Sequence, residues 1–209
     1  MHDCGNCQEV LVSPLACGAC EHIFPVREAL SPFQVFGMEP VAHVDRAVLR
    51  KRLLKLQRLL HPDFHGQAGG DQQELAEHNT AELNAAYEVL HDEAKRASFL
   101  IQKLGGPKES DERQMPQAFL MEVMEWNEAL EELRDDGDAA AAKARAQELH
   151  EELKIERVRL LDEILDGLHE ALGGDASVDL VILRKQSNAI RYIDRALKEA
   201  SELQLRAVS

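Results

Sequence analysis

Residues 53–63 constrain the fold most, because an amphipathic helix ends abruptly within them. Leucines at helical spacing form one narrow apolar face of this helix: Leu49, Leu53, Leu56 and Leu60. Pro62 disfavours the helical conformation in the residue before it, so the helix must end at about residue 60 or 61. We therefore expect His61 and Asp63 to be displayed on a loop that follows the helix.

The face opposite these leucines is basic. Arginine and lysine occupy it or flank it: Arg50, Lys51, Arg52, Lys55 and Arg58. The whole chain has a formal net charge of -14, yet residues 45–60 hold six Lys or Arg against one acid. Concentrating positive charge on one helix of an acidic chain favours a docking site for an anionic partner surface. The alternative is that these side chains only solvate the helix.

A second helix is predicted after a polar, glycine-bearing loop at residues 64–71, from apolar residues at helical spacing: Leu75, Leu83, Ala86, Tyr87 and Leu90. Two antiparallel helices joined by His61-Pro62-Asp63 resemble a J domain, and residues 84–90 with 95–97 are similar to its second long helix and exit. The resemblance implies that the tripeptide and the basic helix bind a DnaK/HscA-class chaperone and stimulate its ATP hydrolysis. The residues implied are His61, Pro62, Asp63, Arg50, Lys51, Arg52, Lys55 and Arg58.

Within J proteins the chain resembles the HscB family, co-chaperones of iron–sulfur cluster assembly. The stretches that carry this resemblance are residues 31–37, 96–101, 118–122 and 190–194, and the match spans roughly residues 31 to 205. It implies delivery of an IscU-type iron–sulfur scaffold to the chaperone. The chain itself is not expected to be an enzyme, because its sequence has neither a glycine-rich phosphate loop nor a nucleophile motif.

All four cysteines lie in the first twenty residues, in the pattern C-x2-C-x9-C-x2-C formed by Cys4, Cys7, Cys17 and Cys20. Two C-x2-C hooks can place four thiolates around one point, which suits one structural zinc ion in a closed tetrahedral site. Two disulfides, a redox pair or an iron site are the alternatives. We expect Gly5, Gly18 and Ala19 to allow the tight turns, and a small strand pair from Val10, Leu11, Val12, Ile23, Phe24 and Val26. The hooks also resemble an amino-terminal extension of the human and some other HscB proteins.

The fold class predicted is mostly α, with a zinc-ribbon-like module, a J domain whose hairpin carries the His-Pro-Asp loop, and a three-helix bundle. Few aromatics, few prolines and many Ala, Leu, Glu and Gln favour helices. The domains are expected at residues 1–28 (zinc module), 29–105 (J domain), 106–115 (linker) and 116–209 (scaffold-binding bundle).

Punctuation residues set the helix limits. Ser31 or the Ser-Pro pair should begin a short helix that stops at Gly37, and Asp45 should cap the basic helix. A connecting helix is expected over 93–104. The bundle helices are expected over 116–135, 139–172 and 178–206, the last capped by Asp175 or Ser177.

The first bundle helix carries an apolar pair away from its core face. The core face should consist of Phe119, Val123, Trp126, Leu130 and Leu133. Leu120 and Met124 lie about 100° or more from the middle of that face, among acidic residues that include Glu125, Glu128, Glu131 and Glu132. Tyr192 points away from the core stripe of the last helix. The alternative is ordinary packing or isolated surface residues.

By the resemblance, Leu120, Met124 and Tyr192 match the positions with which HscB proteins hold the scaffold. The expected scaffold-binding set is therefore Leu120, Met124, Glu125, Glu128, Glu132 and Tyr192.

Two rival functions follow from the same sequence: a general J protein for unfolded clients, and a zinc-module adaptor that binds another protein or single-stranded nucleic acid. The first lacks support because no Gly/Phe-rich region or peptide-binding β domain is found. The acidic charge disfavours nucleic-acid binding in general, and no run approaches the roughly 20 apolar residues of a membrane span. Met1 lies close to Cys4, which favours the bacterial cytoplasm; a trimmed eukaryotic protein would belong in the mitochondrial matrix. Homodimerisation is left open.

Overall fold

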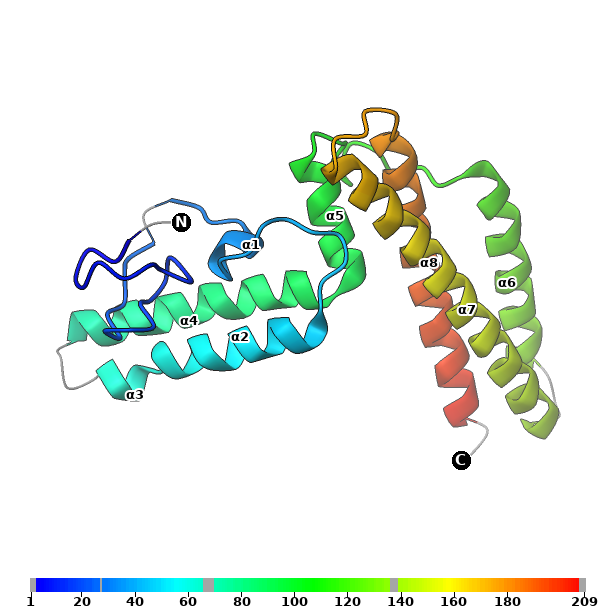
Figure 1. The fold of residues 1–209 in the computed structure, drawn as a ribbon. Helices are drawn as coiled ribbons and strands as arrows, with labels where there is room; N and C mark the ends of the chain where they lie inside the picture. The colour runs from blue at the N-terminus through cyan, green and yellow to red at the C-terminus, as the bar shows by residue number, and fades with distance from the viewer. Residues whose placement is uncertain (1–2, 27, 66–69, 136–138, 207–209) are drawn as a thin grey trace. The chain divides into compact units, whose positions relative to one another are not determined.

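The computed structural model describes residues 3–26, 28–65, 70–135 and 139–206 (Figure 1). The predicted mostly α class is confirmed. The helices are α1 (Pro32–Val35), α2 (Arg46–Leu59), α3 (Pro62–His65), α4 (Gly70–His91), α5 (Glu93–Lys103), α6 (Gln117–Asp135), α7 (Ala139–Leu172) and α8 (Leu180–Arg206). The chain divides into two compact units, Met1–Arg96 and Ala97–Ser209. The predicted domain limits remain predictions.

The hairpin of α2 and α4 organises the first unit. The predicted stripe of Leu49, Leu53, Leu56 and Leu60 is buried against this core, and α2 packs on α4. Asp45 caps α2 as predicted, because its carboxylate accepts the N–H groups of Ala47 (2.8 Å) and Val48 (3.0 Å).

The end of α2 is predicted correctly, but the expected loop is partly helical. The helix stops at Leu59, as the proline rule requires. Pro62 then begins the short helix α3, whose bounds are Pro62–His65. Proline suits a first helical position because its φ is already helical and its missing N–H needs no partner. His61 Nδ1 accepts the N–H of Asp63 (3.3 Å) and so caps α3.

Within the first unit, the short helix α1 contacts the cysteine-bearing segment. Ser31 and Gln34 form a capping box at its start. Gly37 ends it at φ 58°, and a Cβ there would lie 1.9 Å from the carbonyl oxygen of Val12, so only glycine fits. Ser13 Oγ also donates to the carbonyl of Val35 (2.8 Å). The first unit therefore contains both the cysteine segment and the hairpin.

A buried asparagine of α4 makes the second attachment of the cysteine segment. Asn79 is fully buried. Its Nδ2 donates to the carbonyl oxygens of Leu15 (3.3 Å) and Phe24 (2.9 Å), on either side of the second cysteine hook. Because a buried amide donor without an acceptor is costly, these bonds fix the hook on α4.

The second unit contains a three-helix bundle, in which α7 runs antiparallel to α6 and α8 (Figure 1). The predicted helix limits agree closely with the observed ones. Phe119, Leu130 and Leu133 are buried as expected, whereas Val123 and Trp126 are half-buried. The predicted cap of α8 is wrong, because its capping residue is Asp179. The carboxylate of Asp179 accepts the N–H of Val181 (2.8 Å), while that of Asp175 turns back to the N–H of Ser177 (2.8 Å).

Residues 107–114 are tied to α8 by two buried polar side chains. Arg184 is 1% exposed and donates to Ser98 Oγ (3.0 Å), the carbonyl of Ser98 (3.1 Å) and that of Pro107 (3.0 Å). Burial lowers the pKa of Arg184. Asn188 donates to the carbonyls of Glu112 and Gln114, both at 2.8 Å. The stretch expected as a linker is thus anchored to the bundle.

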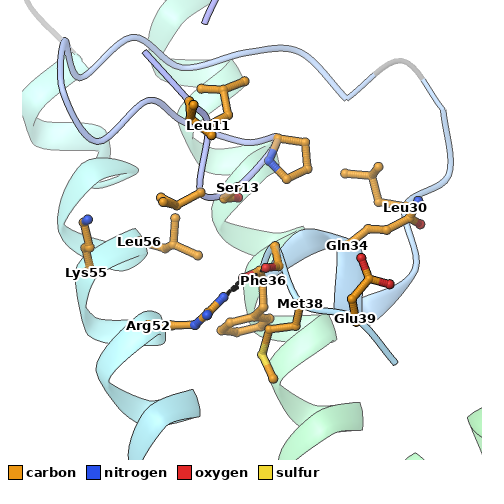
Figure 2. Close-up of a pocket in the computed structure, with 14 residues that line it drawn as sticks. Leu11, Ser13, Leu30, Gln34, Phe36, Met38, Glu39, Arg52, Lys55 and Leu56 are labelled. Atoms are coloured by element: carbon orange, nitrogen blue, oxygen red, sulfur yellow. Dashed lines mark hydrogen bonds between the residues drawn. The ribbon is translucent and has the colours of Figure 1, made fainter. Parts of the chain in front are cut away.

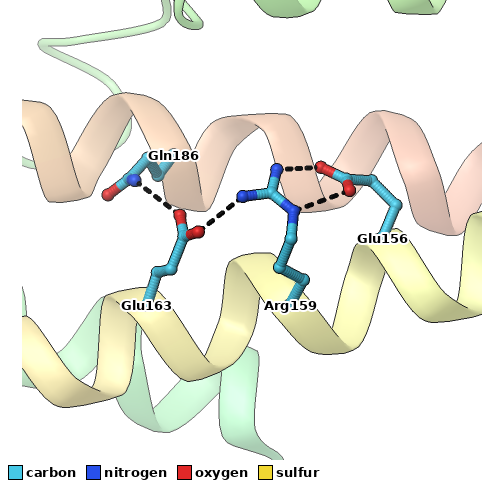
Figure 3. A network of polar contacts seen from close by, with 4 residues as sticks. All are labelled: Glu156, Arg159, Glu163 and Gln186. Carbon is cyan, nitrogen blue, oxygen red and sulfur yellow. Dashed lines mark hydrogen bonds and ion pairs between the residues drawn. The ribbon is translucent and has the colours of Figure 1, made fainter.

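An ion-pair network joins α7 to α8 on the surface (Figure 3). Arg159 donates to Glu156 and Glu163, and Gln186 of α8 donates to Glu163 (3.5 Å). The hydrogen bond with Glu156 is the main cause that raises the pKa of Arg159. Because Arg159 is half exposed, this network contributes little to stability. None of the described helices is both long and apolar enough to cross a bilayer.

Candidate docking surfaces and metal centre

The His-Pro-Asp tripeptide is exposed at the turn between α2 and α4. The side chain of Asp63 is 87% exposed and that of His61 54%, with 3.7 Å between Asp63 Oδ2 and His61 Nδ1. Thr80 of α4 donates its hydroxyl to the carbonyl of Leu60 (3.2 Å), which fixes the base of the turn. A carboxylate held outward on a fixed turn can pair with a cation of another molecule.

The basic face of α2 divides into two kinds of side chain, although all five predicted residues are exposed. Arg52 donates to the carbonyls of Phe36 (2.9 Å) and Gly37 (3.0 Å), so it also closes the end of α1 (Figure 2). Lys55 lies against Gly18, where an added Cβ would be 3.3 Å from Lys55 Nζ. Within the described part of the chain, the remaining three form no ion pair: Arg50, Lys51 and Arg58.

An apolar groove borders this face between the cysteine segment, α1 and α2, with a volume of about 620 Å³ (Figure 2). Its wall includes Leu11, Leu30, Phe36, Met38 and Leu56, with Arg52 and Lys55 at one side. The groove is formed by contacts between distant segments, and no pattern in the sequence predicted it.

The four cysteines converge as predicted, and all four are free thiols. Their sulfur atoms lie within 4.8 Å of one another, with Cys4 and Cys20 at 3.7 Å and Cys7 and Cys17 at 3.7 Å. Among the described residues they are joined by no disulfide. This arrangement is a four-sulfur site able to bind a metal ion.

The two hooks share one backbone geometry, and Gly5, Gly18 and Ala19 lie in their turns as predicted, although none of them takes the left-handed conformation. The left-handed positions are Gln8 (φ 64°) and Glu21 (φ 60°), each directly after the second cysteine of its hook. Their N–H groups bond back to the carbonyls of Cys4 (2.8 Å) and Cys17 (3.0 Å).

The predicted strand pair in the cysteine segment is wrong. The segment forms only isolated bridges, Asp3 with Val10 and Ala16 with Ile23. Each bridge flanks one hook, and the backbone between the two bridged residues forms a turn and not an extended strand.

The ionisation of the thiols is uneven. Asn6 Nδ2 donates to Cys20 Sγ (3.4 Å), and this bond is the main cause that lowers the pKa of Cys20 to about 6. The backbone of Glu9 lowers the pKa of Cys7, but desolvation and the neighbouring cysteines outweigh it and raise the pKa to about 12. Four thiolates cannot share this space without a cation, so the donor set fits a thiophilic metal ion.

The apolar residues proposed from α6 and α8 are exposed, with exposed fractions of 46% for Leu120, 62% for Met124 and 43% for Tyr192. Met121, at 69%, is a further exposed residue on the same turn. Sequence reasoning missed it, although its adjacent position could have suggested it. The acidic neighbours Glu125, Glu128 and Glu132 are exposed as well.

Ion pairs show which flank of each helix carries these residues. Arg134, on the same side of α6 as Leu120, pairs with Glu199 of α8 (2.6 Å), and Glu199 lies two turns beyond Tyr192 on one flank of α8. The opposite flanks face α7, because Asp194 pairs with Arg157 (2.5 Å). Glu122 of α6 likewise has its pKa raised by burial and by Glu156 of α7. We call the surface formed by Leu120, Met124 and Tyr192 the α6/α8 seam.

Comparisons with known proteins agree with this architecture. Residues 31–99 match the DnaJ domain model, and residues 115–201 match the HSCB C-terminal oligomerisation domain model. A co-chaperone protein HscB homolog of Cupriavidus taiwanensis is 33% identical over 165 residues, covering 78% of this chain and 93% of the relative.

Two solved structures share the fold. The crystal structure of the human co-chaperone protein HscB has a TM-score of 0.72 and 24% identity, covering 98% of each chain. Chaperone HscB from Vibrio cholerae has a TM-score of 0.69 and 21% identity, covering 85% of this chain and 99% of that one.

The fold and the exposed His-Pro-Asp turn define a J-domain co-chaperone with a helical carboxyl-terminal domain. More narrowly, the chain belongs to the HscB family of co-chaperones.

Proposed function

We propose that this chain stimulates ATP hydrolysis by a DnaK-class chaperone and delivers an iron–sulfur scaffold protein to it. The observation that carries the proposal is the exposure of the Asp63 side chain, which is 87% exposed on the turn that follows α2 and its basic face. The carboxyl-terminal domain matched at residues 115–201 supports the second half of the proposal.

The chaperone binds through charge. Arg50, Lys51 and Arg58 have no internal ion pair among the described residues, so their full charge is available to an acidic partner. Complementary charges of this kind chiefly raise the association rate. Asp63 then pairs with a cation of the bound chaperone, and Pro62 holds the turn in place.

The scaffold binds through apolar contact at the α6/α8 seam. Leu120, Met124 and Tyr192 offer exposed apolar surface, and Glu125, Glu128 and Glu132 add exposed negative charge on α6. A small apolar centre with a charged rim is the usual arrangement of a specific protein interface.

The cysteine site holds one zinc ion through Cys4, Cys7, Cys17 and Cys20. Tetrahedral zinc with Zn–S bonds of about 2.3 Å needs sulfur atoms about 3.8 Å apart, and two of the pairs here are 3.7 Å apart. A four-thiolate zinc site is closed, so the ion would supply structural cross-linking and no open coordination position.

The test is steady-state ATP turnover by a purified DnaK-class chaperone, with the wild-type chain and Asp63→Asn, each with and without the scaffold. We expect the wild type to stimulate ATP turnover and the scaffold to increase this stimulation further. Asp63→Asn should not stimulate turnover with or without the scaffold, but it should still bind the scaffold. Asp162→Asn, the same change at an exposed position of α7, serves as the control. Equal stimulation by Asp63→Asn would overturn the proposal, and binding of a denatured model protein instead of the scaffold would favour a general client role.

A further inference from the structure

Beside the α6/α8 seam lies an open groove of about 590 Å³ whose charge is opposite to that of the chain. It is lined by Glu109, Ser110, Arg113, Asn188, Arg191, Tyr192 and Arg195. Three arginines thus face one glutamate, in a protein whose formal net charge is -14. Nothing in the sequence pattern marked this cluster, because Arg113 precedes α6 while the other two arginines belong to α8.

The ion pairs that these arginines form within the chain leave part of their positive charge and hydrogen-bonding capacity available. Arg191 pairs with Glu109. Arg195 shares Glu199 (3.1 Å) with Arg134 (2.6 Å). Arg113 is exposed and forms no ion pair with the described residues. The side chains of Arg191 and Arg195 are 63% and 79% exposed, so their remaining N–H groups can reach a ligand.

A buried asparagine ties the two sides of the groove together at its base. Asn188 is 4% exposed and its amide binds the carbonyls of Glu112 and Gln114, both at 2.8 Å. These bonds hold residues 112–114, and therefore the backbone of Arg113, against α8. Three arginines whose backbone positions are fixed in this way suit carboxylates, since arginine can donate two parallel hydrogen bonds to one carboxylate.

We propose that this groove binds acidic side chains of the same scaffold protein that docks on the α6/α8 seam, an inference that rests on the function proposed above. Tyr192 carries the argument, because it lines the groove and also belongs to the seam. A partner in contact with Tyr192 therefore covers both. The matching partner surface has basic residues toward the glutamates of α6 and acidic residues toward the groove, which fixes its orientation on the bundle.

A nucleic acid is the less favoured ligand for these arginines. The strong negative charge of the chain repels a long phosphate backbone, whereas a protein can present a few carboxylates at one place. The charge pattern therefore favours the protein partner, and the phosphate alternative becomes an outcome of the test.

The experiment measures the Kd of an IscU-type scaffold by calorimetry at low and high salt, for the full chain and its variants. Arg113→Gln should raise Kd about twofold to fivefold at low salt, since exposed charge pairs contribute modestly. Arg113→Gln combined with Arg195→Gln should raise it about threefold to tenfold. Both effects should shrink at high salt, and Arg113→Lys, which keeps the charge but loses the paired hydrogen bonds, should restore only part of the affinity.

Lys143→Gln, an equal loss of one exposed charge on α7, is the matched control and should leave Kd unchanged. Circular dichroism should show the same helicity for all variants. Unchanged Kd for the double arginine variant, with binding still lost in Leu120→Ala/Met124→Ala, would overturn the groove but leave the proposed function intact. Wild-type chain that binds no scaffold would overturn both. An anionic oligonucleotide that binds the wild type, loses binding in the arginine variants and leaves scaffold Kd unaffected would also overturn the proposal.

Discussion

The two docking surfaces of this protein differ in how they offer binding energy. In the first unit, Arg50, Lys51 and Arg58 of α2 form no ion pair with the described residues, a buried leucine stripe lies on the opposite face, and Asp63 is exposed on the turn that follows. In the second unit, Leu120, Met124 and Tyr192 are exposed apolar residues, and α6 adds exposed carboxylates at Glu125, Glu128 and Glu132. The charged surface attracts its partner over a distance, whereas the apolar surface contributes binding free energy only when contact buries it. Amphipathic helices, each with one buried and one exposed face, thus provide both an electrostatic and an apolar binding surface.

The contact surface should be the more sensitive of the two to truncation. We expect Leu120→Ala combined with Met124→Ala and Tyr192→Ala to raise the Kd for the scaffold about 100-fold or more, because central apolar residues dominate interfaces. Stimulation of the chaperone in the absence of scaffold should not change. Calorimetry and ATP turnover measure the two effects. Val158→Ala, which trims an exposed apolar residue of α7, is the control, and an equal loss of both activities in the triple variant would contradict the separation of the surfaces.

Metal removal should affect the first unit alone. Cys17→Ser, or chelation of the wild type, should destabilise residues 3–96 by about 2 kcal/mol or more, a decrease in Tm of about 10 °C, because a metal site of this size supplies folding free energy. The bundle should melt unchanged. Differential scanning calorimetry of the full chain resolves this, with Ser177→Ala as a control in the second unit. A shift of the bundle transition, or none at all, would contradict the expectation.

The association rate with the chaperone should depend more strongly on salt concentration than the association rate with the scaffold. Lys51→Gln with Arg58→Gln should slow association with the chaperone about tenfold at low salt and much less at high salt, because exposed charges act through a screened field. Scaffold association should keep its wild-type rate. Stopped-flow measurements on both partners test this, and equal slowing at every salt concentration would show that the two cations act through contact instead.

The smallest effect expected is that of Arg52→Gln, which distinguishes two arginines of one basic face. Arg52 donates to the carbonyls of Phe36 and Gly37, so its loss should cost about 1 kcal/mol of folding free energy. Chaperone association should slow less than it does for Arg58→Gln. Urea titration measures the folding free energy, and stopped flow measures the association rate. Unchanged stability would mean that these hydrogen bonds are exchanged for water at no net cost.

Local rules predicted the parts of the fold that local interactions decide. The stop before Pro62, the cap by Asp45 and the leucine stripe of α2 all depend on residues within one or two turns. The convergence of four cysteines was also predictable, because two hooks at this spacing have few other geometries.

Competition between similar local signals explains the errors. Asp175 and Asp179 are both good caps, and only the structure shows that Asp175 turns to Ser177 while Asp179 caps α8. Tyr87, one of the residues whose spacing predicted α4, is only half-buried, with its ring 5.1 Å from that of His91. The hydrogen bonds of Arg52 and the arginine groove depend on residues far apart in sequence, which no period or motif reveals.

Asn79 has a geometric consequence for α4. Its amide holds two carbonyls, of Leu15 and Phe24, which lie on opposite sides of one cysteine hook. A helix held at one buried residue by two carbonyls of the same loop cannot rotate about its axis or slide along it without straining or breaking these hydrogen bonds. The azimuth and register of α4 are therefore set from outside the helical hairpin, by a loop whose own shape depends on four sulfur atoms.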